Sequence, residues 1–151
     1  MAAMTTLDDA LAHVLAQAQL LGTENVDLFN ADGRVLAQDC ISALQVPPQD
    51  NSAIVGYAVR AADITAAGVA LHVSQRIPAG HVGTELQPGT VARIFTGAPV
   101  PPDADAVLMQ EDTQVLEDGR VQFNAVPKPG QNIRRAGEDI ALNSAVLTAG
   151  T

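Results

Sequence analysis

The spacing of apolar residues along the chain changes once, and the change separates two kinds of predicted element. From Leu7 to Leu21 apolar residues recur every three or four positions, the spacing of one face of an α-helix. Thr6, with Asp9 three residues later, resembles a capping box, and Gly22 is a suitable C-terminal cap. We therefore predict an amphipathic helix that begins after Thr6 and ends near Gly22.

After Gly22 short apolar runs with an alternating pattern predict strands. We expect two short strands around a helical turn within 24–44, and further strands after residue 50. Asp118-Gly119 predicts a hairpin turn, and Gly56 within its run predicts a bulge or a close approach by another chain or a ligand. The proline-rich segment 99–102 is expected to stay outside any sheet. The predicted strands cover 54–59, 69–73, 90–95, 106–109, 113–116 and 121–123.

These elements predict an α+β fold that is mostly β, with an N-terminal helix followed by short strands in coiled or barrel-like sheets. Proline and glycine residues concentrate near residues 46–48 and 128–137. Because such punctuation marks joints between compact parts, we predict a β-rich subdomain over 46–135. Residues 1–45 and 136–151 are then expected to form a helix-and-strand subdomain.

Composition limits the classes of function. Of the 151 residues 47% are hydrophobic but only 3% are aromatic, so the core must consist of Ala, Val, Leu and Ile. The net charge of −9 argues against nucleic acid as a partner. A small anion stays possible, because screening over roughly 8 Å lets a local arginine cluster outweigh distant carboxylates.

The ends and the cysteine content predict a soluble, cytoplasmic protein without a membrane partner. Cys40 is the one cysteine, so neither a disulfide framework nor a thiolate metal cluster is expected. The residues from Met1 to Met4 lack the features of a signal peptide, and no apolar run reaches the ~18 residues of a membrane span.

Two turn-rich segments offer oxygen atoms or backbone groups to a ligand. The side chains of Asp50, Asn51 and Ser52 can bond the local backbone in a turn, or they can present oxygens to a ligand. Thr96 offers a hydroxyl, and the backbone at Gly97 can approach an anion closely, although the same pair also suits a simple strand-end turn.

A third segment combines two arginines with two carboxylates. Arg134 and Arg135 stand beside Glu138 and Asp139, which is compatible with a salt-bridged corner. Alternatively, the arginines bind an anion while a carboxylate holds Mg²⁺ or handles a proton. The residue pattern leaves both interpretations open.

Five segments, in this order and spacing, resemble the N-terminal region of the molybdopterin molybdenumtransferase family, whose bacterial members are called MoeA and which includes gephyrin. The resemblance covers about residues 6–151. The five segments are Val46–Arg60, Ile77–Gly80, Arg93–Pro102, Ala104–Asp112 and Gly130–Asp139.

The resemblance implies an enzyme of molybdenum cofactor biosynthesis that inserts molybdate into adenylylated molybdopterin and releases AMP with the help of Mg²⁺. It implies a homodimer whose active site combines this region of one subunit with a pterin-binding domain of the other. The pterin-binding and C-terminal domains would follow Thr151 and are absent from this chain. We therefore expect the chain alone to be inactive.

The family motif carries site residues over to this sequence with one important departure. The motif reads Asp-Asn-Ser-Ala-Met-Asp-Gly-Tyr-Ala, and Ile54 and Val55 replace its Met and second Asp. Gln49 also replaces an apolar residue. Because Val55 can neither bind Mg²⁺ nor carry charge, a non-catalytic interaction or dimerisation module of the same fold is the alternative hypothesis.

The resemblance implies two groups of site residues and leaves the metal ligands unassigned. The catalytic candidates are Thr96, Glu138 and Asp139. The candidates for binding the small anionic pterin substrate are Asp50, Asn51, Ser52, Arg134 and Arg135.

Overall fold

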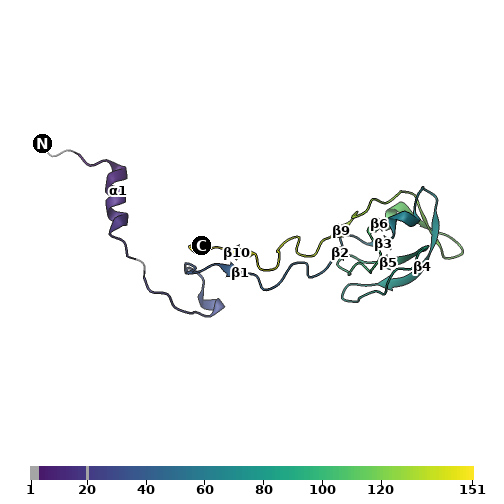
Figure 1. Cartoon of the computed structure of the whole chain (residues 1–151), viewed down its shortest axis with the longest axis horizontal. Coiled ribbons are helices and arrows are strands. Elements are labelled where there is room, and N and C mark those ends of the chain that lie inside the picture. The colour runs from purple at the N-terminus through teal and green to yellow at the C-terminus, as the bar shows by residue number, and fades with distance from the viewer. Residues whose placement is uncertain (1–3, 20) are drawn as a thin grey trace. The chain divides into compact units, whose positions relative to one another are not determined.

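The computed structural model describes residues 4–19 and 21–151, in two compact units (Figure 1). One unit contains the described residues up to Asp39 together with Thr148–Thr151, and the other is Cys40–Leu147. The division predicted at residues 45/46 and 135/136 stays a prediction. The strands are β1 (Cys40–Ile41), β2 (Asn51–Ser52), β3 (Gly56–Val59), β4 (Ala70–Ile77), β5 (Thr90–Ile94), β6 (Ala106–Met109), β7 (Thr113–Val115), β8 (Val121–Phe123), β9 (Ile133–Arg134) and β10 (Ala145–Leu147).

The N-terminal helix α1 (Leu7–Ala16) begins where the sequence predicts and ends earlier. The Thr6 hydroxyl accepts a hydrogen bond from the Asp9 N–H at 3.2 Å, which confirms the cap. The sequence predicts a helix that continues to residue 21, and this prediction is wrong for residues 17–19 and 21, which are not helical. Leu20 lies outside the described residues. Because no α1 residue is buried, tertiary packing does not prolong the helix. None of the described helices is long and apolar enough to cross a membrane.

The helical turn predicted within 24–44 is present as a 3₁₀ turn at Leu28–Asn30, but the strand expected before it, around Val26 and Leu28, is absent. The Asp27 carboxylate accepts a hydrogen bond from the Phe29 N–H at 3.3 Å, and this local cap competes with strand pairing. Further 3₁₀ turns lie at Ala61–Asp63 and Gln110–Asp112. Around residue 41 the second predicted strand is present as β1, which pairs antiparallel with β10.

A curled six-stranded sheet dominates the second unit, in the strand order β6-β3-β5-β4-β8-β7. Figure 1 labels four of its strands, β6, β3, β5 and β4. Strands β4 and β5 run parallel, and the other neighbours run antiparallel. Strands β7 and β8 form the hairpin predicted from Asp118-Gly119. The predicted α+β class, mostly β, is confirmed.

The central strands are buried on both faces, and their side chains alternate between two apolar clusters. Tyr57 and Val59 of β3 join one cluster, whereas Ala58 joins the other. The same alternation separates Val91 from Ala92 in β5, as the twofold period of a strand requires. Because an apolar cluster covers each face of the central strands, these strands hold the loops at the edges of the sheet in fixed positions.

Gly56 opens β3 at the point where β6 comes closest. A Cβ atom on Gly56 would lie 1.9 Å from the carbonyl oxygen of Leu108. Only a residue without a side chain fits here. The close neighbour is a strand of the same chain, whereas we expected a bulge, another chain or a ligand.

Candidate functional site

Two of the three polar segments meet in the short ladder between β2 and β9 (Figure 1). Asn51 pairs with Arg134, and Ser52 pairs with Ile133. The turn expected at residues 50–52 is therefore partly a strand, because these residues find a backbone partner more than eighty positions away. Sequence spacing offered no signal for that partner. The ladder places the Asp50 segment beside the two arginines.

The Thr96 segment joins the same ladder through the backbone of Ser52. The Ser52 N–H donates to the Ala98 carbonyl at 2.9 Å, and the Gly97 N–H donates to the Ser52 carbonyl at 2.9 Å. Gly97 has a φ of 77°, so the exposed turn that carries Thr96 uses the left-handed conformation that glycine allows. All three predicted polar segments are thus connected by backbone hydrogen bonds.

The proline-rich segment after that turn also contacts the ladder. Pro99 forms an isolated antiparallel bridge with Asn51, whereas we expected the segment to stay outside any sheet. The bridge needs no donor from Pro99, because the Val100 N–H donates to the Asp50 carbonyl at 2.9 Å and the Ser52 N–H donates on the other side. This arrangement fixes the backbone of Asp50.

Asp50 accepts two hydrogen bonds from the Arg135–Ala136 segment. One carboxylate oxygen lies 2.5 Å from the Arg135 guanidinium, and the other accepts from the Ala136 N–H at 2.9 Å. The hydrogen bond from the Ala136 N–H is the largest influence and holds the pKa of Asp50 below its ordinary value of 3.8. Desolvation opposes this lowering, and the Arg135 guanidinium adds to it. Sequence analysis missed Ala136, since a backbone donor has no residue-type signature.

Arg134 and Arg135 each engage a carboxylate of the same turn. The Arg134 guanidinium donates to both oxygens of Asp139, at 2.5 and 2.6 Å, and Asp139 raises the pKa of Arg134. The Arg135 N–H donates to Glu138 at 2.8 Å. We call Asp50, Arg134, Arg135, Glu138 and Asp139 the polar corner. The ion pairs at its surface are partly exposed and individually weak.

Asn51 and Ser52 are less accessible than the polar corner. Ser52 is 1% exposed, and its hydroxyl donates to the Ile54 carbonyl at 2.7 Å. Asn51 is half-buried in the ladder. The anion-binding roles predicted for these two residues, like the roles of the other site residues, stay predictions.

The polar corner does not fit a magnesium ion. Asp50, Glu138 and Asp139 all bond to arginine groups or backbone N–H groups, and the described part of the chain contains no group of three His, Cys, Asp or Glu residues arranged to hold a metal. Mg²⁺ prefers an octahedral set of oxygens, and Val55 supplies no side-chain oxygen. We therefore assign no metal ligand in these residues.

The β-rich unit and its polar corner define a member of the MoeA N-terminal family. The family model described as MoeA N-terminal region (domain I and II) matches residues 5–151. The chain therefore belongs to this family. The match covers both described units.

The relatives of this chain are molybdopterin molybdenumtransferases. The protein of that name from Haemophilus influenzae is 44% identical over 149 residues, which cover 97% of this chain and 37% of the relative. The one from Nostoc is 46% identical over 134 residues, covering 85% of this chain and 29% of the relative. The chain thus spans about a third of these relatives.

A solved structure has the same fold. The crystal structure of the molybdopterin biosynthesis MoeA protein from Pyrococcus horikoshii aligns with a TM-score of 0.77 at 38% identity, covering 84% of this chain and 35% of that one. The fold and the family therefore agree with the resemblance in the sequence.

Proposed function

We propose that this chain is the N-terminal region of a molybdopterin molybdenumtransferase and that its polar corner lines one wall of the active site. The proposed reaction of the complete enzyme inserts molybdate into adenylylated molybdopterin in the cytoplasm. The observation that carries the proposal is the junction at Ser52, where its backbone joins the Thr96 turn to the β2–β9 ladder. That junction holds the Thr96 hydroxyl and the arginine segment on one framework.

The polar corner suits a small anionic pterin substrate better than a neutral one. The Arg134 and Arg135 guanidiniums stay partly exposed, at 43% and 59% of their side-chain surface, although both are paired. Arg retains donors after one carboxylate is bound, so an anion can be added without burying a free charge. Glu138 and Asp139 keep these forks oriented.

We further propose that this chain alone does not catalyse molybdate insertion. Val55 stands where the family motif has an acid, and a positioned acid or base commonly contributes 10²- to 10⁴-fold in rate. The carboxylates of the polar corner are already engaged by arginines and backbone N–H groups. In this proposal the Mg²⁺ ion takes its oxygen ligands from outside the polar corner, and the pterin needs additional binding residues there.

A chimera tests the role of the chain and of Val55 together. This chain replaces the matching N-terminal 37% of the Haemophilus influenzae relative, and AMP release from adenylylated molybdopterin is measured with and without molybdate. We expect Val55→Asp to raise the molybdate-dependent rate of the chimera by about a hundredfold, the lower end of what one positioned acid contributes. The matched control is Val115→Asp, because Val115 is exposed in the edge strand β7.

Two results separate the proposal from the interaction-module alternative. Equal rates for the Val55 and Val55→Asp chimeras would favour a module that kept the fold without the chemistry. Molybdate-dependent AMP release by the isolated 151-residue chain would contradict the proposed inactivity. The intact mass of the protein from its native cells is the first measurement, since a mass equal to the 15.6 kDa of this chain would remove the basis for a transferase.

We also propose that a second copy of the chain covers the apolar stripe of α1, as part of a homodimer. Leu7, Leu11, Val14 and Leu15 are 83, 54, 65 and 62% exposed, and the helix buries no residue within its own unit. An apolar stripe of this kind gains stability when it is removed from water.

Sedimentation equilibrium tests the dimer. We expect Leu11→Glu to shift the protein towards the monomer, because a charge in the stripe opposes burial. Ala16→Glu is the control, since position 16 lies on the opposite side of the helix from the stripe. A parent chain that already sediments as a monomer, or equal effects of both variants, would contradict this interface.

A further inference from the structure

A basic and aromatic cluster lies on the six-stranded sheet, outside the polar corner. In β5, Arg93 is paired with Tyr57 of β3 on one side and with Arg76 of β4 on the other. Residues paired in this way point to the same face of the sheet. Because Val91 shares that face and belongs to the same core as Tyr57, the two arginines border this core.

The ring of Phe95 stands close to both guanidinium groups. The Cζ atom of Arg76 lies 4.7 Å from the ring centroid, and that of Arg93 lies 5.2 Å from it. Arg93 also lies 4.9 Å from the Tyr57 ring centroid. Cation–π contacts orient a guanidinium and attract it, but they leave its full charge in place. We call Arg76, Arg93 and Phe95 the arginine–phenylalanine cluster.

Neither charge of this cluster is balanced by a carboxylate. Within the described part of the chain no Asp or Glu oxygen lies within 4.0 Å of either guanidinium, whereas the other five arginines all have such a partner. Arg93 donates to the Gly56 carbonyl at 3.2 Å and to the Gln110 side-chain oxygen at 2.5 Å. These neutral acceptors leave the charge of Arg93 uncompensated.

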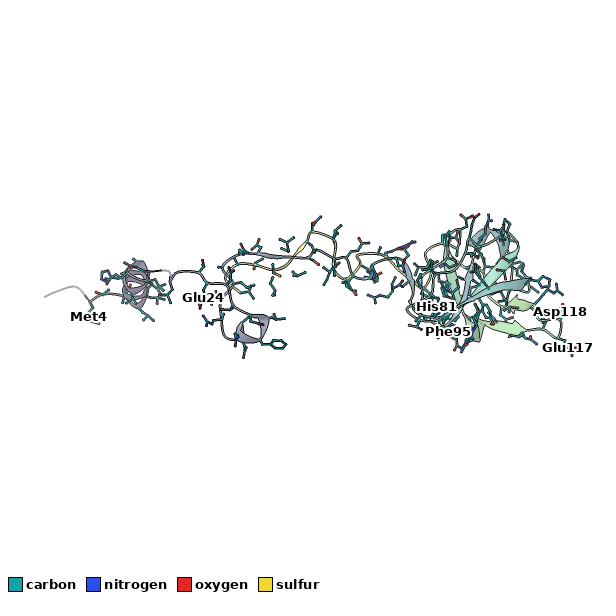
Figure 2. All side chains as sticks on the ribbon, turned by 90° about the horizontal axis from the view of Figure 1, so that it is seen from below. Met4, Glu24, His81, Phe95, Glu117 and Asp118 are labelled. Atoms are coloured by element: carbon teal, nitrogen blue, oxygen red, sulfur yellow. The ribbon has the colours of Figure 1, made fainter. Side chains whose placement is uncertain are left out.

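Glu111, the neighbour of Gln110 in the chain, makes no ion pair with the cluster. Glu111 accepts from the amide nitrogen of Gln110 at 3.3 Å and is thus one side chain removed from Arg93. Figure 2 shows Glu117 and Asp118 at the opposite end of the β-rich unit from Phe95. Arg76 and Arg93 occupy directly opposed positions, where like charges are destabilising. The two arginines lie side by side although the net charge of the chain is −9.

We propose that the arginine–phenylalanine cluster binds a dianionic tetrahedral oxyanion of the phosphate type. The planar forks of two arginines match such oxygens, and a dianion balances both charges. The Phe95 ring holds the forks in place before binding, which lowers the entropy lost when the anion arrives. The site uses none of the residues of the polar corner, although Phe95 directly precedes Thr96 in the chain.

The test is an NMR titration of the arginine Nε–Hε resonances in the whole 151-residue chain. Inorganic phosphate and phenyl phosphate are the two probes, and sodium chloride at equal ionic strength is the salt control. We expect saturable shifts at Arg76 and Arg93 with phosphate and no matching curve with chloride. Tighter binding of phenyl phosphate indicates a phosphomonoester on a larger molecule, whereas equal affinity indicates free phosphate.

Two variants make the result specific. Arg76→Gln should weaken phosphate binding about tenfold, the effect of losing one charge-assisted contact, and because Arg76 is exposed the fold should survive. Arg120→Gln is the matched control and should leave binding unchanged, because Arg120 is paired with Asp118 at 2.7 Å. Equal affinity of the parent and the Arg76→Gln variant, or shifts at Arg120 as large as those at Arg76, would overturn the site.

Discussion

Replacing Gly56 with alanine tests the close approach between β3 and β6. The added methyl group would lie 1.9 Å from the Leu108 carbonyl oxygen and 2.9 Å from its carbonyl carbon. Because an ordinary carbon–oxygen contact is about 3.3–3.6 Å, β6 would have to retreat from β3 by more than about 1 Å. That movement disturbs a ladder whose inner residues, Val107 and Leu108, are fully buried. We expect a loss of about 3 kcal/mol in the free energy of unfolding, the upper end of the range for overpacking.

Urea denaturation followed by tyrosine fluorescence measures this loss. Tyr57 is the only tyrosine, the chain has no tryptophan, and Tyr57 is 7% exposed within the affected core. Gly97→Ala is the control, because its methyl group would meet nothing within 4 Å and adds only the strain of a φ of 77°. That strain amounts to about 1 kcal/mol. A Gly56→Ala variant as stable as Gly97→Ala would refute the reasoning.

Two further predictions concern the segment around Gly56. The pKa of Asp50 is lowered in the folded chain, so its stabilising effect is fully present above its ordinary value of 3.8 and is lost as the pH falls through the folded value. Urea denaturation should therefore give a stability difference between the parent and Asp50→Asn that is constant near neutral pH and shrinks below pH 3.8. A stability difference that grows below pH 3.8 would contradict the lowered pKa of Asp50. Ser52→Ala should cost about 1–2 kcal/mol, because the half-buried Ile54 carbonyl loses the hydroxyl donor of the buried Ser52 side chain. An unchanged urea midpoint would disprove this role.

Local elements were predictable wherever a few neighbouring residues decide them. The Thr6 cap and the Asp118-Gly119 hairpin follow from side chains and turn geometry within four residues, and both are present. The end of α1 and the strand expected near Val26 were predicted wrongly, because apolar spacing is informative only when something covers the apolar face. The stripe of α1 is exposed within its unit, so its periodicity did not extend the helix.

For the candidate site, the sequence was sufficient to predict some features, whereas others depended on the tertiary structure. By itself the sequence determined the residue types, the order of the three polar segments, the family and the loss of the acid at Val55. Only the tertiary structure decided that Asp50 bonds to Arg135 and Ala136, and that Ser52 joins the Thr96 turn to the ladder. These partners are set by strand register between distant segments. Register depends on which faces the whole core buries, and no local spacing encodes it.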